Sequence, residues 1–288
     1  MLGAGDLVFC SANLMHAGLR AKLEAAQAGG FRGISLWPSD YQQARGEGLS
    51  DAQIRRLLAD HGVEIAELDT LITWLPGSEP APGLSARDRA AFGATADEFF
   101  AIADALGARS LNLAQAPGPK PAFETLVECF ARTCDRAAEH GLLCVLEFLP
   151  FSEVRNAATA QAIVDAAGRG NGGIMFDTWH HFRGGGGAAE IRTLRGDRIQ
   201  GLQLNDAPAA PEPDLVQASM TSRLAPGEGA IPLAAWLHEL DAIGCRAPLG
   251  VEVFSTALSA LPPAVLGRRL GAATRRVLSD ARGAATPA

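Results

Sequence analysis

Residues 137–147 read Ala-Ala-Glu-His-Gly-Leu-Leu-Cys-Val-Leu-Glu, and they hold one complete unit of the pattern that predicts the fold. The alanine-rich run before Gly141 favours a helix. A glycine directly after a helix supplies the left-handed conformation that ends it. The apolar run Leu142–Glu147 is too short for a helix and suits a strand buried on both faces. An acidic residue, Glu147, closes this predicted strand.

The same unit recurs along the chain, because a helical stretch that ends at glycine precedes each later short apolar run. With a first run near the amino terminus, the pattern predicts eight strands: Leu7–Cys10, Gly33–Leu36, Val63–Leu68, Ser110–Leu113, Leu142–Glu147, Gly173–Asp177, Ile199–Gln203 and Leu249–Val253. Strands that alternate with helices form a parallel sheet. Eight units in 288 residues favour a closed barrel over an open sheet. No GxGxxG sequence follows the first strand to indicate a dinucleotide-binding fold.

We therefore predict the α/β class and a single (β/α)8 TIM barrel over residues 1–280, with a frayed tail over residues 281–288. Three proline-rich segments follow the third, fourth and seventh strands: Pro76–Pro82, Pro117–Pro121 and Pro208–Pro213. In a barrel these segments are loops at the functional end. They are not expected to be linkers between domains.

Composition argues against several classes of function. A net charge of −7 leaves no basic face for nucleic acid or an anionic membrane. No stretch of about 18 apolar residues predicts a membrane span, and no signal peptide is visible. The five cysteines are odd in number and form no CxxC pair, which fits reduced thiols. We expect a cytoplasmic protein without nucleic-acid or membrane partners.

Acidic or amide side chains close four consecutive predicted strands: Glu147, Asp177, Gln203 and Glu252. Catalytic groups of barrels lie at the carboxyl ends of strands. Carboxylates are almost never fully buried unless they are paired or bind a metal. Three of them at one barrel mouth would repel each other, and a divalent cation relieves that repulsion. Oxygen ligands favour Mg²⁺ or Mn²⁺ over zinc, although each carboxylate alone would fit an exposed loop equally well.

Several segments together carry a resemblance to a known family. They are Phe31–Leu36, His61–Glu64, Leu146–Phe148 with Glu153, Phe176–His180, Arg223, Pro226–Gly229 and Val251–Val253. On these segments the chain resembles the sugar phosphate isomerase/epimerase superfamily of xylose isomerase-like barrels. That superfamily includes D-tagatose and D-psicose 3-epimerases and inosose dehydratases. It also holds isomerases and an endonuclease branch, so the resemblance does not select a substrate.

The resemblance implies roles for particular residues. The residues that match the metal ligands are Glu147, Asp177, Gln203 and Glu252. The residues that match substrate-binding positions are Glu153, His180 and Arg223. Most members have histidine as the third ligand, where this chain has Gln203. An amide oxygen is a harder ligand than imidazole and should push selectivity toward Mg²⁺ or Mn²⁺.

Three other side chains are candidates for substrate contacts because they follow predicted strands. They are His16 after the first strand, Trp37 after the second and Trp74 after the third. An aromatic ring there could cover a face of a sugar. Packing within a loop is an equally good interpretation for each of the three.

The function that follows is that of a metal-dependent isomerase or epimerase acting on a non-phosphorylated sugar or keto-sugar. By the resemblance, Glu147 and Glu252 form an acid/base pair that acts through an enediolate, stabilised by the cation. The first alternative is a lyase or dehydratase that eliminates water or another group from a keto-polyol or 3-keto-glycoside, because the enediolate is shared. The second is a non-catalytic ligand-binding barrel. We expect a small-molecule carbohydrate substrate and leave a homodimer or homotetramer open.

Overall fold

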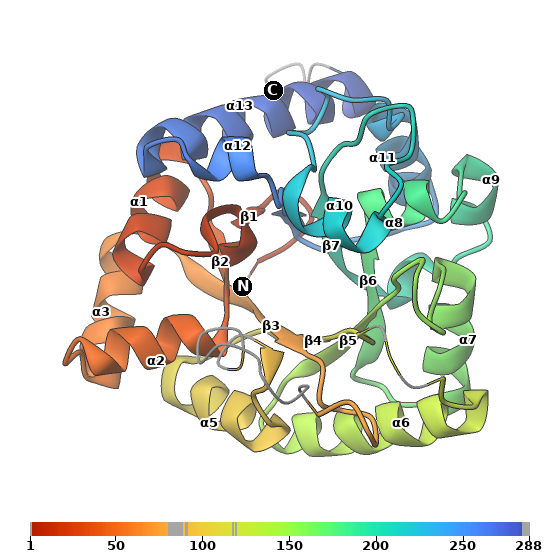
Figure 1. The fold of residues 1–288 in the computed structure, drawn as a ribbon, viewed down its shortest axis with the longest axis horizontal. Coiled ribbons are helices and arrows are strands. Elements are labelled where there is room, and N and C mark those ends of the chain that lie inside the picture. The colour runs from red at the N-terminus through yellow and green to blue at the C-terminus, as the bar shows by residue number, and fades with distance from the viewer. Residues whose placement is uncertain (1, 80–88, 90–91, 117, 119, 284–288) are drawn as a thin grey trace.

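The computed structural model describes residues 2–79, 89, 92–116, 118 and 120–283. Its strands form one closed parallel barrel in sequence order (Figure 1). They are β1 (Leu7–Phe9), β2 (Gly33–Leu36), β3 (Glu64–Leu71), β4 (Ser110–Leu113), β5 (Leu143–Glu147), β6 (Gly172–Asp177), β7 (Ile199–Leu204) and β8 (Leu249–Val251). The barrel closes where β1 pairs with β8, with Leu7 opposite Leu249 and Phe9 opposite Val251. The predicted (β/α)8 fold is confirmed.

The long helices surround the barrel on its outside, and α10 (Leu215–Thr221) lies over its carboxyl end, where Ser219 and Met220 line a cavity (Figure 1). The described helices are α1 (Leu19–Gly29), α2 (Pro38–Gly46), α3 (Asp51–Asp60), α5 (Ala96–Leu106), α6 (Phe123–Glu139), α7 (Ala157–Ala167), α8 (Thr178–Arg183), α9 (Ala188–Ile191), α10 (Leu215–Thr221), α11 (Leu233–Ala242), α12 (Thr256–Ser259) and α13 (Pro263–Arg282). Two short 3-10 segments are η1 (Ser11–Leu14) and η2 (Gly196–Arg198). The prediction that glycines end helices holds for α1 and α7, which are followed directly by Gly30 and Gly168 in the left-handed conformation. None of the described helices has the length and hydropathy that a membrane span requires.

The ends of several elements differ from the sequence expectation. β3 continues to Leu71, past the predicted end at Leu68, and β8 stops at Val251. α13 continues to Arg282, so the helix includes the first two residues of the expected tail. Residues 284–288 of that tail lie outside the described residues, as do 80–82, 117 and 119 of the proline-rich segments. All five cysteines are buried and free.

Helices α1 and α13 pack against each other and complete the outer layer of helices. Glycines permit this contact: a Cβ at Gly267 would lie 1.9 Å from the carbonyl oxygen of Ala25, and one at Gly271 would lie 2.2 Å from that of Gly29. Inside this layer, every residue of β2 and β6 is buried. The strands are therefore buried on both faces, as their apolar sequences predict.

Candidate active site

Three acidic side chains and one amide lie at the carboxyl ends of β5 to β8. Glu147 and Asp177 are the last residues of β5 and β6. Gln203 lies in β7 directly opposite Asp177 in the strand register. Glu252 follows β8 directly, and all four side chains are buried. The structure thus gathers the four predicted metal ligands at one end of the barrel.

Gln203 is held in place by Glu252. Its Nε2 donates a hydrogen bond to Glu252 Oε1 at 3.1 Å. This leaves Gln203 Oε1 buried without a hydrogen-bond partner among the described residues. An unsatisfied buried acceptor costs about 1–3 kcal/mol, and amide oxygens are good ligands for hard cations. The donor set therefore fits a divalent cation.

Arg223 supplies positive charge to this cluster. Its Nη1 donates to Asp177 Oδ2 at 2.8 Å and to Glu252 Oε2 at 3.1 Å, and its Nε donates to the Ser219 carbonyl at 2.8 Å. When ionised, Glu147, Asp177 and Glu252 carry three negative charges against the single positive charge of Arg223. Asp69 lines the same cavity as Glu147 and Glu252 and adds a fourth carboxyl group, so the cluster has an excess of negative charge that a divalent cation would reduce. Arg223 was predicted to bind substrate, and the structure places it on two of the predicted metal ligands.

The carboxylates differ in their affinity for a proton. Burial, with the neighbouring charge of Asp177 as a further cause, raises the pKa of Glu147 well above its ordinary value. Burial likewise raises the pKa of Glu252, although Arg223 opposes the effect. Burial also opposes ionisation of Asp177, but the charge of Arg223 together with hydrogen bonds from the His180 main-chain N–H and the Asn205 amide outweighs it, and the pKa of Asp177 is lowered. Glutamates with strongly perturbed pKa values in a pocket are candidates for acid/base catalysis.

His180 lies between Glu147 and Arg223. Its Nε2 is 3.5 Å from Glu147 Oε1 and 3.2 Å from Arg223 Nη2. A guanidinium group only donates, so Nε2 accepts and the proton belongs on Nδ1. Burial lowers the pKa of His180 to about 3, which keeps the ring neutral. Side-chain ligand atoms of His180, Glu147 and Asp177 all lie within 4.8 Å of one another, so His180 is an alternative to Gln203 as a cation ligand.

Four of these side chains, Glu147, His180, Arg223 and Glu252, border a partly open cavity of about 150 Å³, whereas Asp177 and Gln203 are not among the described residues that line it. Its charged or ionisable lining residues are Asp69, Glu147, His180, Arg223 and Glu252. Much of the rest of the wall is apolar and includes Trp37, Phe92, Phe151 and Phe254. The rings of Trp37 and Phe92 are 5.4 Å apart, and the Arg223 guanidinium lies 5.0 Å above the ring of Phe254. The cavity can hold one small molecule between an acidic cluster and aromatic walls.

The structure does not bring every predicted substrate contact to this cavity. Of the three loop candidates, Trp37 lines it. His16 lines a neighbouring cavity of about 550 Å³ instead. Trp74 is buried, and its indole Nε1 donates to the Ala114 carbonyl at 2.9 Å, so its role is in loop packing. Glu153 pairs with Arg155 at 3.1 Å and is not among the described residues that line the cavity.

Sequence reasoning missed the contribution of β3 and β4. Asp69 lines the cavity, and Asn112 Nδ2 donates to Asp69 Oδ1 at 2.9 Å and to Glu147 Oε2 at 2.8 Å. Glu67 lies buried two residues before Asp69 and accepts from the Cys10 thiol at 3.6 Å. The alternation Glu67-Leu68-Asp69 was the available signal, because residues two apart in a strand point to the same face.

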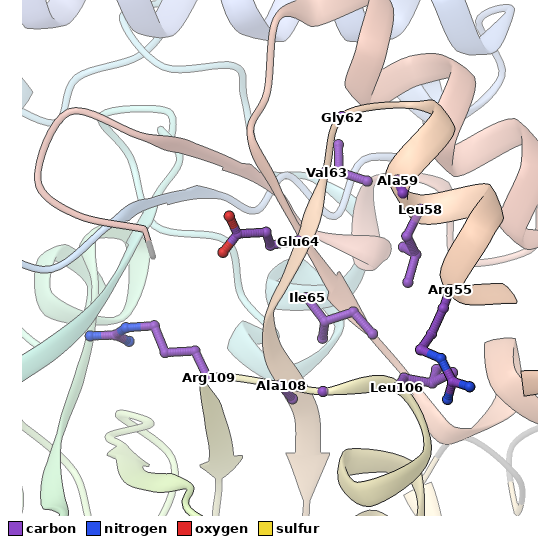
Figure 2. Close-up of a pocket in the computed structure, with 11 residues that line it drawn as sticks. Arg55, Leu58, Ala59, Gly62, Val63, Glu64, Ile65, Leu106, Ala108 and Arg109 are labelled. Atoms are coloured by element: carbon purple, nitrogen blue, oxygen red, sulfur yellow. The ribbon is translucent and has the colours of Figure 1, made fainter. Parts of the chain in front are cut away.

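A larger, open cavity of about 760 Å³ lies at the opposite end of the barrel, where β3 and β4 begin. Figure 2 shows Glu64 and Arg109 extending to one side and Arg55 to the other. Arg55 and Arg109 donate to the main-chain carbonyls of Ala105 and Gln200. Their guanidinium groups therefore hold the main chain, which is the role expected at the amino-terminal face of a barrel.

Comparison with known proteins gives a consistent relationship. Residues 23–273 match the model of a family described as xylose isomerase-like TIM barrel. A 3-dehydroshikimate dehydratase of Pseudomonas aeruginosa is 30% identical over 252 residues, which are 85% of this chain and 37% of that protein. An inosose isomerase of Bacillus velezensis is 32% identical over 129 residues, covering 44% of this chain and 45% of that one. The matched segments thus span less than half the length of these relatives.

Solved structures agree with this fold. The crystal structure of an IOLI protein with a bound zinc atom matches with a TM-score of 0.83 and 20% identity. The match covers 96% of this chain and 99% of that one. At this identity the similarity concerns the fold.

Proposed function

Because the chain belongs to the xylose isomerase-like TIM barrel family, we propose that it is a divalent-cation-dependent lyase. The reaction proposed is removal of a proton beside a ring ketone, followed by loss of a β-hydroxyl group as water. The observation that carries the proposal is the pair Glu147 and Glu252, both with raised pKa values, on the wall of one small cavity. The other two predicted cation ligands lie buried beside this pair: Gln203 donates to Glu252, and Asp177 accepts from Arg223.

Each residue of the site has a separate role in the proposed reaction. One of Glu147 and Glu252 accepts the proton from the carbon beside the carbonyl, and the other, in its protonated form, gives a proton to the departing hydroxyl so that it leaves as water. Positioned acids and bases of this kind contribute about 10²–10⁴-fold. Neutral His180 lines the cavity, and its Nε2 accepts from Arg223 and lies 3.5 Å from Glu147 Oε1, so the ring holds these two side chains in position. Arg223 stabilises negative charge on the neighbouring carboxylates and on the substrate. A divalent cation held by Glu147, Asp177, Gln203 and Glu252 would supply a Lewis acid for the carbonyl oxygen.

The shape of the cavity favours a compact ring over an extended sugar. Aromatic side chains form much of the wall that the charged cluster leaves: Trp37, Phe92, Phe151 and Phe254. The hydroxyls of an open-chain polyol would face these rings without hydrogen-bond partners, and each such loss is costly. A ring that presents its oxygens on one edge can place them at the acidic cluster and its carbon faces against the aromatic side chains.

The first substrate to test is 3-dehydroshikimate, the compound named in the P. aeruginosa relative. This ring ketone has a hydroxyl beside the carbonyl and a second hydroxyl on the next carbon. The proton is removed from the carbon beside the carbonyl, which carries the first hydroxyl. The second hydroxyl then leaves as water. Enolisation of the resulting ring ketone gives an aromatic dihydroxybenzoate. With Mg²⁺ or Mn²⁺ present, we expect an increase in ultraviolet absorbance from that product.

Variants of the two glutamates provide the mechanistic test. Glu147→Gln and Glu252→Gln should each lower kcat by at least about 100-fold, because a positioned base is lost. Far-ultraviolet circular dichroism should stay unchanged. Glu64→Gln is the matched control, since this glutamate lies at the opposite end of the barrel and the variant should retain most activity. Full activity in either cavity variant would contradict the two-glutamate scheme.

A second candidate is the isomerase or epimerase reaction. It is supported by two carboxylates in one cavity, which could remove and return a proton on different faces, and by the inosose isomerase relative. Incubation in D₂O with ketoses and inososes distinguishes the candidates. Deuterium beside the carbonyl in a substrate or epimer without loss of water supports the isomerase. If the protein catalyses neither deuterium exchange nor loss of water with any of the ring ketones and ketoses, both candidate reactions are overturned.

A further inference from the structure

An amide inside the barrel bridges two carboxylates of the site. Asn112 lies in the middle of β4, opposite Val145 of β5, and is fully buried. Its single Nδ2 group donates to Asp69 Oδ1 at 2.9 Å and to Glu147 Oε2 at 2.8 Å. We propose that Asn112 is a positioning residue that fixes the carboxylate of Glu147. The proposal rests on the function proposed above for Glu147.

The contacts show that Asn112 acts through Glu147. It is absent from the described residues that line the cavity, whereas both of its partners line it. Each amide hydrogen has its own carboxylate acceptor, so the donor capacity of Nδ2 is used completely. Nδ2 faces both carboxyl groups, while Oδ1 points away from them and is buried without a hydrogen-bond partner among the described residues. The hydrogen-bond pattern therefore fixes the orientation of the Asn112 side chain.

This arrangement determines which oxygen of Glu147 is available for chemistry. Oε2 is tied to Asn112, while Oε1 lies on the side of His180, 3.5 Å from its Nε2. Oε1 is thus the atom left to meet a proton or a cation. Partners behind ligands of this kind typically change metal affinity or activity by about 10- to 100-fold when they are removed.

The test removes the amide donors while keeping most of the side-chain volume. For Asn112→Leu, we expect kcat to fall by about 10- to 100-fold with little change in KM. The dissociation constant for Mn²⁺, measured by titration calorimetry, should rise by a similar factor. Asn171→Leu is the matched control, because Asn171 Nδ2 also donates twice, to the Cys134 and Leu142 carbonyls, but at the other end of β5. It should lower the melting temperature without changing kcat or Mn²⁺ affinity.

A second variant, Asn112→Ser, tests the proposal in case Asn112→Leu does not fold. Asn112→Ser is smaller and keeps one donor, so it should show a smaller loss in the same two quantities. A double-mutant cycle then isolates the link to Glu147. In a Glu147→Ala background the carboxylate is already gone, and adding Asn112→Ser should change Mn²⁺ affinity less than about twofold.

Two results would overturn the proposal: wild-type kcat and Mn²⁺ affinity in the Asn112 variants, or an undiminished effect in the Glu147→Ala background. The Mn²⁺ titration separates this inference from the proposed reaction. If the wild-type protein binds Mn²⁺ but converts none of the substrates, the proposed reaction fails. The Mn²⁺ affinities of the Asn112 variants still decide whether Asn112 positions Glu147.

Discussion

At the scale of single residues, the buried amide oxygen of Gln203 is the feature that most directly indicates a cation. Glu252 takes the Nε2 donor, and the oxygen has no partner among the described residues. Neutral oxygen ligands suit Mg²⁺ and Mn²⁺, while imidazole suits Zn²⁺ and Co²⁺. The identity of this one side chain should therefore set the preference of the site.

Gln203→His should shift the metal preference of the protein. We expect the affinity for Zn²⁺ or Co²⁺ to rise by at least about tenfold relative to Mg²⁺, because imidazole replaces an amide oxygen. Competition titrations with a chromogenic chelator measure the ratio. An unchanged ratio would show that Gln203 is not a ligand and would favour His180 in that role.

Glu67 should make stability depend on pH. Burial is the main cause that raises its pKa from 4.5 to about 8. The folded protein therefore keeps a proton that the unfolded chain releases, and the resulting stability is fully present below pH 4.5 and lost as pH rises to 8. One such group contributes a slope of at most about 1.4 kcal/mol per pH unit.

Glu67→Gln should reduce this decrease in stability, because the side chain stays neutral at every pH. Urea unfolding at several pH values between 5 and 8 measures the slope for wild type and variant. Glu64→Gln, at an exposed position of the same strand, is the control and should leave the slope unchanged. Equal slopes in wild type and the Glu67 variant would contradict the assignment.

At the scale of elements, a buried ion pair joins α1 to α2. Lys22 Nζ lies 2.6 Å from Asp40 Oδ1, and both side chains are almost completely shielded from solvent. The other oxygen of Asp40 accepts from the Trp37 main-chain N–H at 3.1 Å. The pair therefore fixes the start of α2 beside Trp37, which is part of the cavity wall.

Lys22→Met should lower the free energy of unfolding by about 3–5 kcal/mol, because it leaves the Asp40 carboxylate buried without its cation. Chemical denaturation gives the value. The comparison is Arg45→Met, which breaks an exposed pair with Asp51 at 2.9 Å and should cost at most about 1 kcal/mol. Similar costs for the two variants would mean that the buried pair contributes no more than a surface pair.

At the scale of the whole molecule, the outer layer depends on the close contact between α1 and α13. Gly267→Ala would place a methyl group 1.9 Å from the Ala25 carbonyl oxygen, so the two helices must separate. We expect a loss of about 1–3 kcal/mol or more in the free energy of unfolding. Gly46→Ala is the control, because nothing lies within 4 Å of its added carbon. Equal stability of the two variants would show that the contact tolerates separation.

The architecture could be predicted because its signals are local. A glycine that ends a helix and a short apolar run that forms a buried strand are properties of neighbouring residues. Seven such units and the first apolar run give eight strands, which leave few topologies other than a closed barrel. The four strand-end residues could be assigned for the same reason, since parallel strands place their carboxyl ends together: Glu147, Asp177, Gln203 and Glu252.

Contacts between distant segments were decided by the tertiary structure alone. β3 extends beyond its apolar run, which brings Asp69 to the cavity and lets Asn112 bridge Asp69 and Glu147. Loop positions after strands do not specify where a side chain points, and His16 and Trp74 accordingly lie away from the carboxylates. The sequence by itself thus determined the barrel and its acidic end. The tertiary structure decided which side chains share hydrogen bonds there, because those distances depend on how strands far apart in the chain pack against one another.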